Sequence, residues 1–186
     1  MSRQSVRCCL PALARHSVSV VGLDFTSCSL AEVPRELSVL TSLSSLALSG
    51  NQLAGGWHHL RPLRQLLALN LRRCNLAEVP EDLSALTTLS SLYLSGNEEL
   101  AGGWQHLRPL RQLLVLQLRG CRLAEVPEEL SALTSLSSLN HYGNQGLAGG
   151  WQHLRPLRQL LELDLVGCSL AGVPHELSHL GSVISI

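Results

Sequence analysis

Leucines recur along this chain in a short alternating pattern that returns every 23 or 24 residues. Residues 66–76 (LLALNLRRCNL) and 89–100 (LSSLYLSGNEEL) both carry leucine at places one, four and six. The alternation at places four to six puts two leucines on one face of a β-strand and the residue between them on the other. The pattern therefore predicts one short strand in each repeat. The repeats begin at residues 20, 43, 66, 89, 113, 136 and 160, and a truncated eighth begins at residue 183.

Each predicted strand is followed by leucines spaced three residues apart, as in residues 105–113 (QHLRPLRQL) and 128–136 (EELSALTSL). This spacing favours an α-helical or 3-10 segment that buries one stripe. One strand and one short helical segment cannot bury their own leucines, so each repeat needs neighbours. Stacked repeats predict a curved solenoid with a parallel sheet on its concave face and helical segments on its convex face.

The strand and the turn after it read L-x-x-L-x-L-x-x-N/C-x-L, which resembles the leucine-rich-repeat family over residues 20–186. One kind of repeat, LAEVPEELSALTSL in residues 123–136, is similar to the LPxxLxxLxxL class of intracellular proteins. It alternates with LAGGWQHLRPLRQLL, as in residues 100–114, where tryptophan replaces proline. The resemblance implies an α/β leucine-rich-repeat solenoid that acts as a non-catalytic scaffold and binds a protein partner through its concave face.

The two kinds of repeat differ in their convex segments. We name those that open with LAEVP or LAGVP, from residues 30, 76, 123 and 170, AEVP walls, and those that open with LAGGW, from residues 53, 100 and 147, GGW walls. Two glycines in the GGW wall replace an inward-pointing valine. We expect each indole to fold into the space that the glycines leave, although an exposed, ligand-facing tryptophan is the alternative. The three tryptophans are Trp57, Trp104 and Trp151.

Cysteine and asparagine alternate at place nine of successive repeats. Adjacent parallel strands are about 4.8 Å apart, so cysteines in alternate repeats should lie roughly 10 Å from one another. That distance excludes a disulfide or a shared metal ion, and it applies equally to the recurring wall histidines. The resemblance implies a buried structural ladder, and we expect no metal and no cofactor. The residues concerned are Cys28, Cys74, Cys121 and Cys168, Asn51, Asn97 and Asn144, and His59, His106 and His153.

His141 occupies a core place at which the other complete repeats have leucine or phenylalanine. Either one core position is polar or the strand bulges locally, and we expect this layer to be the weakest of the stack. Charges alternate in sign along the predicted convex face, with Arg61 and Arg108 followed one layer later by Asp82 and Glu128. This alternation predicts ion pairs between layers.

Charge, hydropathy and the absence of known catalytic motifs limit the kinds of partner, location and activity that the sequence predicts. Fourteen basic and fourteen acidic residues cancel, which argues against nucleic acid or an anionic membrane. The sequence contains no run of eighteen or more apolar residues, so no membrane-spanning helix is predicted. Residues 1–19 are interpreted as an N-terminal cap, with organelle targeting by the arginine- and serine-rich residues 1–23 as the alternative. The start lacks the apolar block of a secretory signal, which favours an intracellular, cytoplasmic protein. No nucleophile elbow, phosphate loop or zinc-protease motif occurs, so no catalytic residue is predicted.

The residues expected to face the concave side are those that break the near-identity of the repeats. They occupy places five and seven, between and after the two strand leucines. Tyrosine and arginine are typical anchors of protein interfaces. The candidate binding residues are therefore Arg72, Tyr93, Gln117, Arg119, Asn140 and Tyr142.

Two other functions remain open at this stage. The chain is consistent with a recognition or regulatory domain of a larger enzyme or signalling protein. It is also consistent with a self-assembling repeat protein, because Val183 and Ile186 begin an eighth repeat with no polar cap after it.

Overall fold

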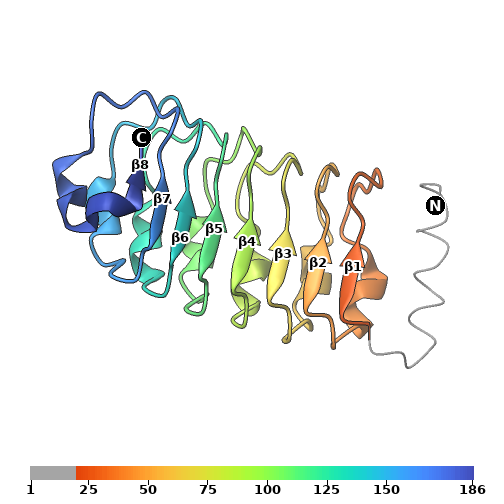
Figure 1. Ribbon diagram of the computed structural model, residues 1–186. Coiled ribbons are helices and arrows are strands. Elements are labelled where there is room, and N and C mark those ends of the chain that lie inside the picture. The colour runs from red at the N-terminus through yellow and green to blue at the C-terminus, as the bar shows by residue number, and fades with distance from the viewer. Residues whose placement is uncertain (1–19) are drawn as a thin grey trace.

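The computed structural model describes residues 20–186 and shows a curved stack of layers (Figure 1). The predicted N-terminal cap or targeting segment, residues 1–19, lies outside the described residues. Within the described part, the strands are β1 (Gly22–Asp24), β2 (Ser45–Ala47), β3 (Ala68–Asn70), β4 (Ser91–Tyr93), β5 (Val115–Gln117), β6 (Ser138–Asn140), β7 (Glu162–Asp164) and β8 (Ile184–Ser185). The 3-10 helices are η1 (Arg35–Val39), η2 (Trp57–Leu60), η3 (Glu81–Ala85), η4 (Trp104–Leu107), η5 (Glu128–Ala132), η6 (Trp151–Leu154) and η7 (His175–Val183).

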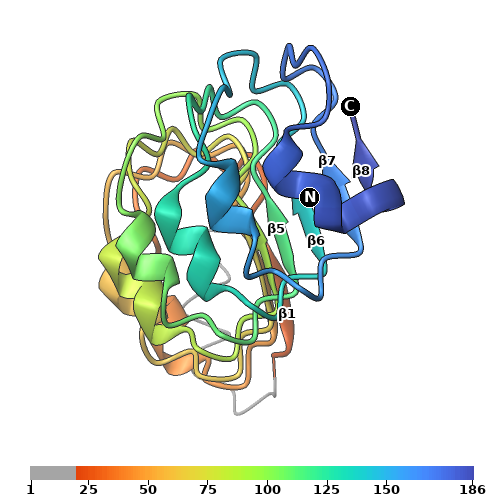
Figure 2. The ribbon, with the colours of Figure 1, turned by 90° about the vertical axis from the view of Figure 1, so that its left-hand side faces the viewer.

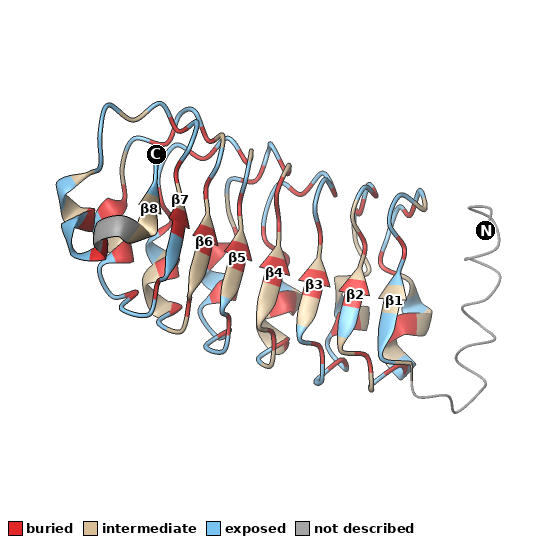
Figure 3. Cartoon of the chain, viewed as in Figure 1, coloured by how far each residue is buried: buried red, intermediate tan, exposed pale blue. Residues whose placement is uncertain are grey.

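The strands form one parallel sheet in which each strand pairs with the next along the chain. The register keeps the same place of every repeat side by side, so Leu69 pairs with Leu92 and Leu92 with Leu116. These leucines are fully buried, whereas the residues on either side of each are partly exposed. Figure 3 shows the result as a buried band across the middle of strands β2 to β7. The alternation read from the sequence is confirmed.

The helical segments lie on the side of the solenoid opposite the strands (Figure 2). All of those in the described residues are 3-10 helices, which complete one turn every three residues and so match the spacing of buried leucines such as Leu107 and Leu110. Each helix has a fixed start: extended Pro80 precedes η3, and left-handed Gly103 precedes η4. The predicted solenoid, with its concave sheet and convex helical segments, is confirmed.

The walls are joined by two kinds of junction. An AEVP wall bonds to the following GGW wall through its backbone, where Val79 N–H donates to the Gly102 carbonyl at 2.9 Å. The same bond recurs from Val126 to Gly149 at 3.0 Å. A GGW wall meets the next AEVP wall through side chains, as where Arg64 Nη1 donates to the Ala85 carbonyl at 2.9 Å. The structural repeat is therefore a pair of layers.

In the GGW walls the expected burial of the tryptophan is confirmed for two of the three rings. Trp104 and Trp151 are buried, with 9% and 6% of their surface exposed, and Trp57 is half-buried. The second glycine also lies directly against the backbone of the preceding layer. Gly103 has φ of 75°, and a Cβ placed there would collide with the Val79 carbonyl of the preceding layer, whereas a Cβ on Gly102 would meet nothing within 4 Å. The second glycine is required by its left-handed backbone and this close approach.

The asparagine and cysteine ladder is confirmed as a structural feature. Asn144 is fully buried; its Oδ1 accepts the backbone N–H groups of Cys121 and Leu123 at 3.0 and 3.1 Å. Its Nδ2 donates to the Leu118 carbonyl at 2.9 Å. The Cys121 thiol donates to the Leu94 carbonyl at 3.4 Å, and burial raises the pKa of this thiol to about 11. These side chains satisfy buried backbone groups of neighbouring layers.

His141 lies in the core without a bulge. Strand β6 keeps its register with both neighbours, and His141 N–H donates to the Asp164 carbonyl at 2.8 Å. The imidazole is completely buried, and neither ring nitrogen has a hydrogen-bond partner. Burial lowers its pKa to about 4. Of the two interpretations, the polar core position is therefore confirmed and the bulge is wrong.

Candidate binding face on the concave sheet

The six candidate residues lie at the ends of strands β3 to β6 or two residues beyond them. Tyr93, Gln117 and Asn140 are the last residues of their strands and pair in register across three adjacent layers. They are half-buried. The residues two places further on are more exposed and are Arg72, Arg119 and Tyr142.

Two arginine–tyrosine stacks form on this face. The guanidinium carbon of Arg72 lies 4.8 Å from the centre of the Tyr93 ring, and that of Arg119 lies 4.3 Å from the centre of the Tyr142 ring. Such contacts are worth about 0.5–1 kcal/mol at exposed sites, and they restrict long side chains that would otherwise be mobile. Each arginine stacks on the tyrosine of the following layer, so four of the six candidates form two separate pairs.

Asn140 has a local structural role that the sequence analysis missed. Its Oδ1 accepts the backbone N–H of Tyr142 at 2.9 Å, and its Nδ2 donates to Asp164 Oδ2 at 2.8 Å. Asn70 receives the Arg72 N–H in the same way at 3.1 Å. The recurrence of asparagine or aspartate at place five could have predicted this role, because these side chains accept a hydrogen bond from the backbone N–H two residues later. Asn140 thus holds the strand end in place as well as lining the face.

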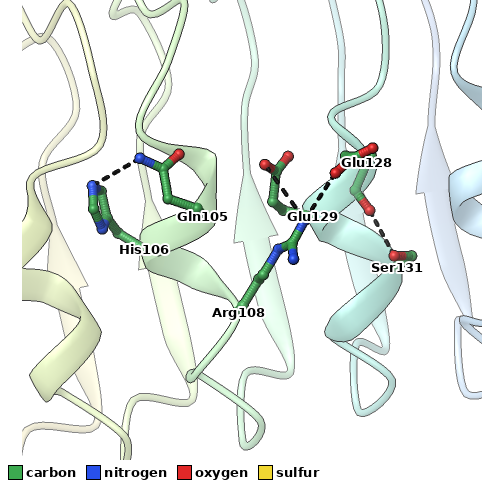
Figure 4. Close-up of polar contacts among 6 residues, drawn as sticks. All are labelled: Gln105, His106, Arg108, Glu128, Glu129 and Ser131. Carbon is green, nitrogen blue, oxygen red and sulfur yellow. Dashed lines mark hydrogen bonds and ion pairs between the residues drawn. The ribbon is translucent and has the colours of Figure 1, made fainter.

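The charges on the two faces are arranged differently. On the convex face, Arg108 lies between two carboxylates, 2.8 Å from Glu128 and 3.9 Å from Glu129 (Figure 4). Arg61 and Asp82 form the corresponding ion pair one pair of layers earlier, so the predicted interlayer ion pairs are confirmed. On the concave face, neither of the stacked arginines has a carboxylate within ion-pair distance among residues 20–186. Their positive charge is open to a partner.

Solved structures with a similar architecture identify the fold. Internalin C2 from Listeria monocytogenes superposes with a TM-score of 0.68 at 20% identity, over 89% of this chain and 74% of that one. A leucine-rich-repeat protein of Leptospira interrogans superposes with a TM-score of 0.60 at 20% identity, over 96% of this chain and 56% of that one. The chain has the leucine-rich-repeat fold. A scan against protein-family models and a search of curated proteins find no match.

Within this leucine-rich-repeat solenoid, a row of exposed apolar side chains was missed by the sequence analysis. Its members occupy place two of alternate repeats, immediately before the strands. The signal was the doubled leucine that opens three of those repeats, of which the first is buried and the second exposed; the first repeat opens with two valines instead. We name this set the apolar row: Val21, Leu67, Leu114 and Leu161, with 59%, 48%, 44% and 76% of their surface exposed.

The intervening layers hold the backbone of the apolar row in place. Ser90 occupies place two between Leu67 and Leu114, and its hydroxyl donates to the Leu67 carbonyl at 3.0 Å. Ser137 does the same for the Leu114 carbonyl at 3.1 Å. Alternate serine and leucine therefore give one margin of the sheet an apolar side chain in every second layer, on a fixed backbone.

The convex side of the leucine-rich-repeat solenoid has openings between an AEVP wall and the next GGW wall. One, of about 740 Å³, is lined by residues that include Glu32, Glu36 and His59. A second, of about 450 Å³, includes Glu125, Glu129 and His153 in its lining. Across residues 20–186, no three histidine, cysteine or acidic side chains group as metal ligands would. Nor does this part of the chain contain a helix with the length and apolar character needed to span a bilayer.

Proposed function

We propose that this chain is a non-catalytic, intracellular scaffold that binds a protein partner through the concave face of its sheet. The observation that carries the proposal is the pair of arginine–tyrosine stacks. Arginine and tyrosine supply a large share of the binding energy in protein interfaces, and side chains that are already ordered lose less entropy on binding.

Two further features support a protein as the partner, and a third supports the intracellular location. The total charge of the chain is zero, and at places five and seven of the repeats in residues 20–186 only Arg72 and Arg119 are basic, so an extended polyanion would find few cationic contacts on this face. Together with these arginines, the apolar row at the other margin of the sheet offers the mixed polar and apolar contacts of a protein interface. The described cysteines are unpaired thiols, as is usual in a reducing compartment.

The experiment is an affinity capture from lysate of the source organism, followed by mass spectrometry. Wild type is compared with Arg72→Ala/Tyr93→Ala/Arg119→Ala. The matched control is Arg111→Ala/Arg158→Ala, which removes two exposed arginines on the convex side. Circular dichroism before capture verifies that all three proteins are folded.

We expect a partner that is retained by wild type and by the control but lost by the concave variant. Equal retention by all three proteins would move the binding site to the walls or to the ends of the solenoid. Recovery of this chain alone would favour self-assembly.

A further inference from the structure

Two rows of exposed side chains lie along opposite margins of the sheet in the same alternate layers. Leu67 and Leu114 of the apolar row stand at place two, and Arg72 and Arg119 stand at place seven of the same two repeats. Each row therefore repeats every second strand, a distance of about 9.6 Å. Within one layer, five residues of extended chain separate the two rows, which corresponds to about 16 Å.

Between the rows, the outward-facing residues occupy places three and five of each repeat. Place three holds Ala68 and Val115 in these layers and Ser91 in the layer between them, and all three are half-buried. Short side chains at place three and the half-buried Tyr93 and Gln117 at place five lie between the two exposed rows, and a rod-shaped segment can lie over them, across the strands and parallel to the axis of the solenoid.

The spacing selects the secondary structure of that segment. On an α-helix, residues seven apart lie on the same face and about 10.5 Å from one another, close to the period of both rows. Residues on one face of a β-strand recur at about 6.6 or 13 Å, which does not match. A polyproline II segment repeats at about 9.3 Å, but it is too thin to reach rows about 16 Å apart. A helix with side chains is about 10–12 Å across and can contact both rows.

The charges select its chemistry. Arg72 and Arg119 have open guanidinium groups, fixed on the rings of Tyr93 and Tyr142. Beyond them the face turns acidic: the layer of β7 carries Glu162 and Asp164 and has Val166 at the place of the arginines. An acidic helix is thus attracted over β3 to β6 and repelled further along.

Given the scaffold function proposed above, we propose that the partner segment is an acidic amphipathic α-helix laid across strands β3 to β7, with its acidic part over β3 to β6. Two carboxylates, seven residues apart, bind Arg72 and Arg119. Apolar side chains with the same seven-residue spacing contact Leu67 and Leu114, and a third reaches Leu161. At the next heptad position after the carboxylates, the helix carries a residue without negative charge, because that position faces Val166 beside the acidic pair.

The test uses a fluorescent synthetic helix of about three heptads in which leucine and glutamate recur every seventh residue on adjacent stripes. Three comparison probes are a helix with lysine for glutamate, an extended peptide of similar composition interrupted by prolines, and a single-stranded oligonucleotide of equal charge. Binding is measured by anisotropy with wild type, Arg72→Ala/Arg119→Ala and Leu67→Ser/Leu114→Ser. The serine variants take the residue that intervening repeats already carry at this place. Arg111→Ala/Arg158→Ala is again the control.

We expect the acidic helix to bind wild type and the control with equal affinity. Its affinity for each concave variant should be lower by roughly tenfold or more. Equal binding of the lysine helix, the extended peptide or the oligonucleotide would overturn the acidic helix as the ligand class. The experiments distinguish a failure of this inference from a failure of the scaffold function proposed above. If the concave triple variant loses a lysate partner but the acidic helix does not bind, the scaffold function stands and this inference is wrong.

Discussion

Asn97 lies one layer beyond Cys74 and accepts that residue's backbone N–H on its Oδ1 at 2.9 Å. The same oxygen accepts the Leu76 N–H at 3.1 Å, while Nδ2 donates to the Leu71 and Leu94 carbonyls at 3.0 and 2.5 Å. One fully buried amide thus satisfies four backbone groups in two layers.

Replacement of this amide should therefore be costly. Asn97→Ala leaves buried N–H and carbonyl groups without partners, and we expect the free energy of unfolding in urea to fall by about 3 kcal/mol or more. Asn70→Ala is the control, because Asn70 is half-buried and bonds one backbone N–H; it should cost about 1 kcal/mol or less. Equal losses in the two variants would contradict the role of the ladder.

The tryptophans differ in burial and should differ in their contribution. Trp104→Ala creates a core cavity and is expected to lower the free energy of unfolding by about 3–5 kcal/mol. Trp57→Ala should cost less, since that ring is half-buried. Thermal and urea unfolding of both variants measure the difference. A negligible effect for Trp104 would mean that its ring contributes little to the packing between layers.

The two glycines of one GGW wall make a matched pair. Gly103→Ala places a Cβ at φ of 75° against the Val79 carbonyl, and we expect a loss of about 2 kcal/mol or more. Gly102→Ala has open space and should change the free energy of unfolding by less than about 1 kcal/mol. Urea unfolding of the two variants is the measurement, and a larger loss at Gly102 would contradict the contact.

His141 should make the protein sensitive to acid. The unfolded imidazole binds a proton as the pH falls through about 6.5, whereas burial holds the folded pKa at about 4. The stability present above pH 6.5 is therefore lost as the pH falls through this window, and the total loss is on the order of 3 kcal/mol.

His141→Leu restores the residue that most repeats carry there. We expect it to raise the free energy of unfolding at pH 7 by about 2 kcal/mol, since no unpaired polar atom remains in that position. It should also flatten the pH dependence between 6.5 and 4. Urea titrations at a series of pH values compare the two proteins, and parallel curves would show that other groups cause the acid sensitivity.

The leucine skeleton was enough to predict the strands, the sheet and the convex helical segments, because burial of one face is a local property of each repeat. The ladder followed from the recurrence of cysteine and asparagine at one place, together with the family resemblance. The polar core position at His141 was visible as a departure from that skeleton. In each of these cases the decisive residues lie within one repeat.

What the sequence analysis missed depends on contacts between layers. The need for Gly103 arises from Val79, which is distant in sequence, and nothing near the glycine reveals it. The pairing of Arg119 with Tyr142 depends on the paths that two long side chains take across the sheet. Periodicity identifies which residues face outward, but not which of them touch.

The backbone bond from Val79 to Gly102 has an evolutionary consequence. Because the same bond joins three AEVP walls to the GGW walls that follow them, loss of a single layer would place two walls of the same kind in contact and leave their edges mismatched. A gene that encodes this solenoid can grow or shrink without damage only by exchanging segments of about 47 residues, so natural variants of different length should contain whole pairs of layers.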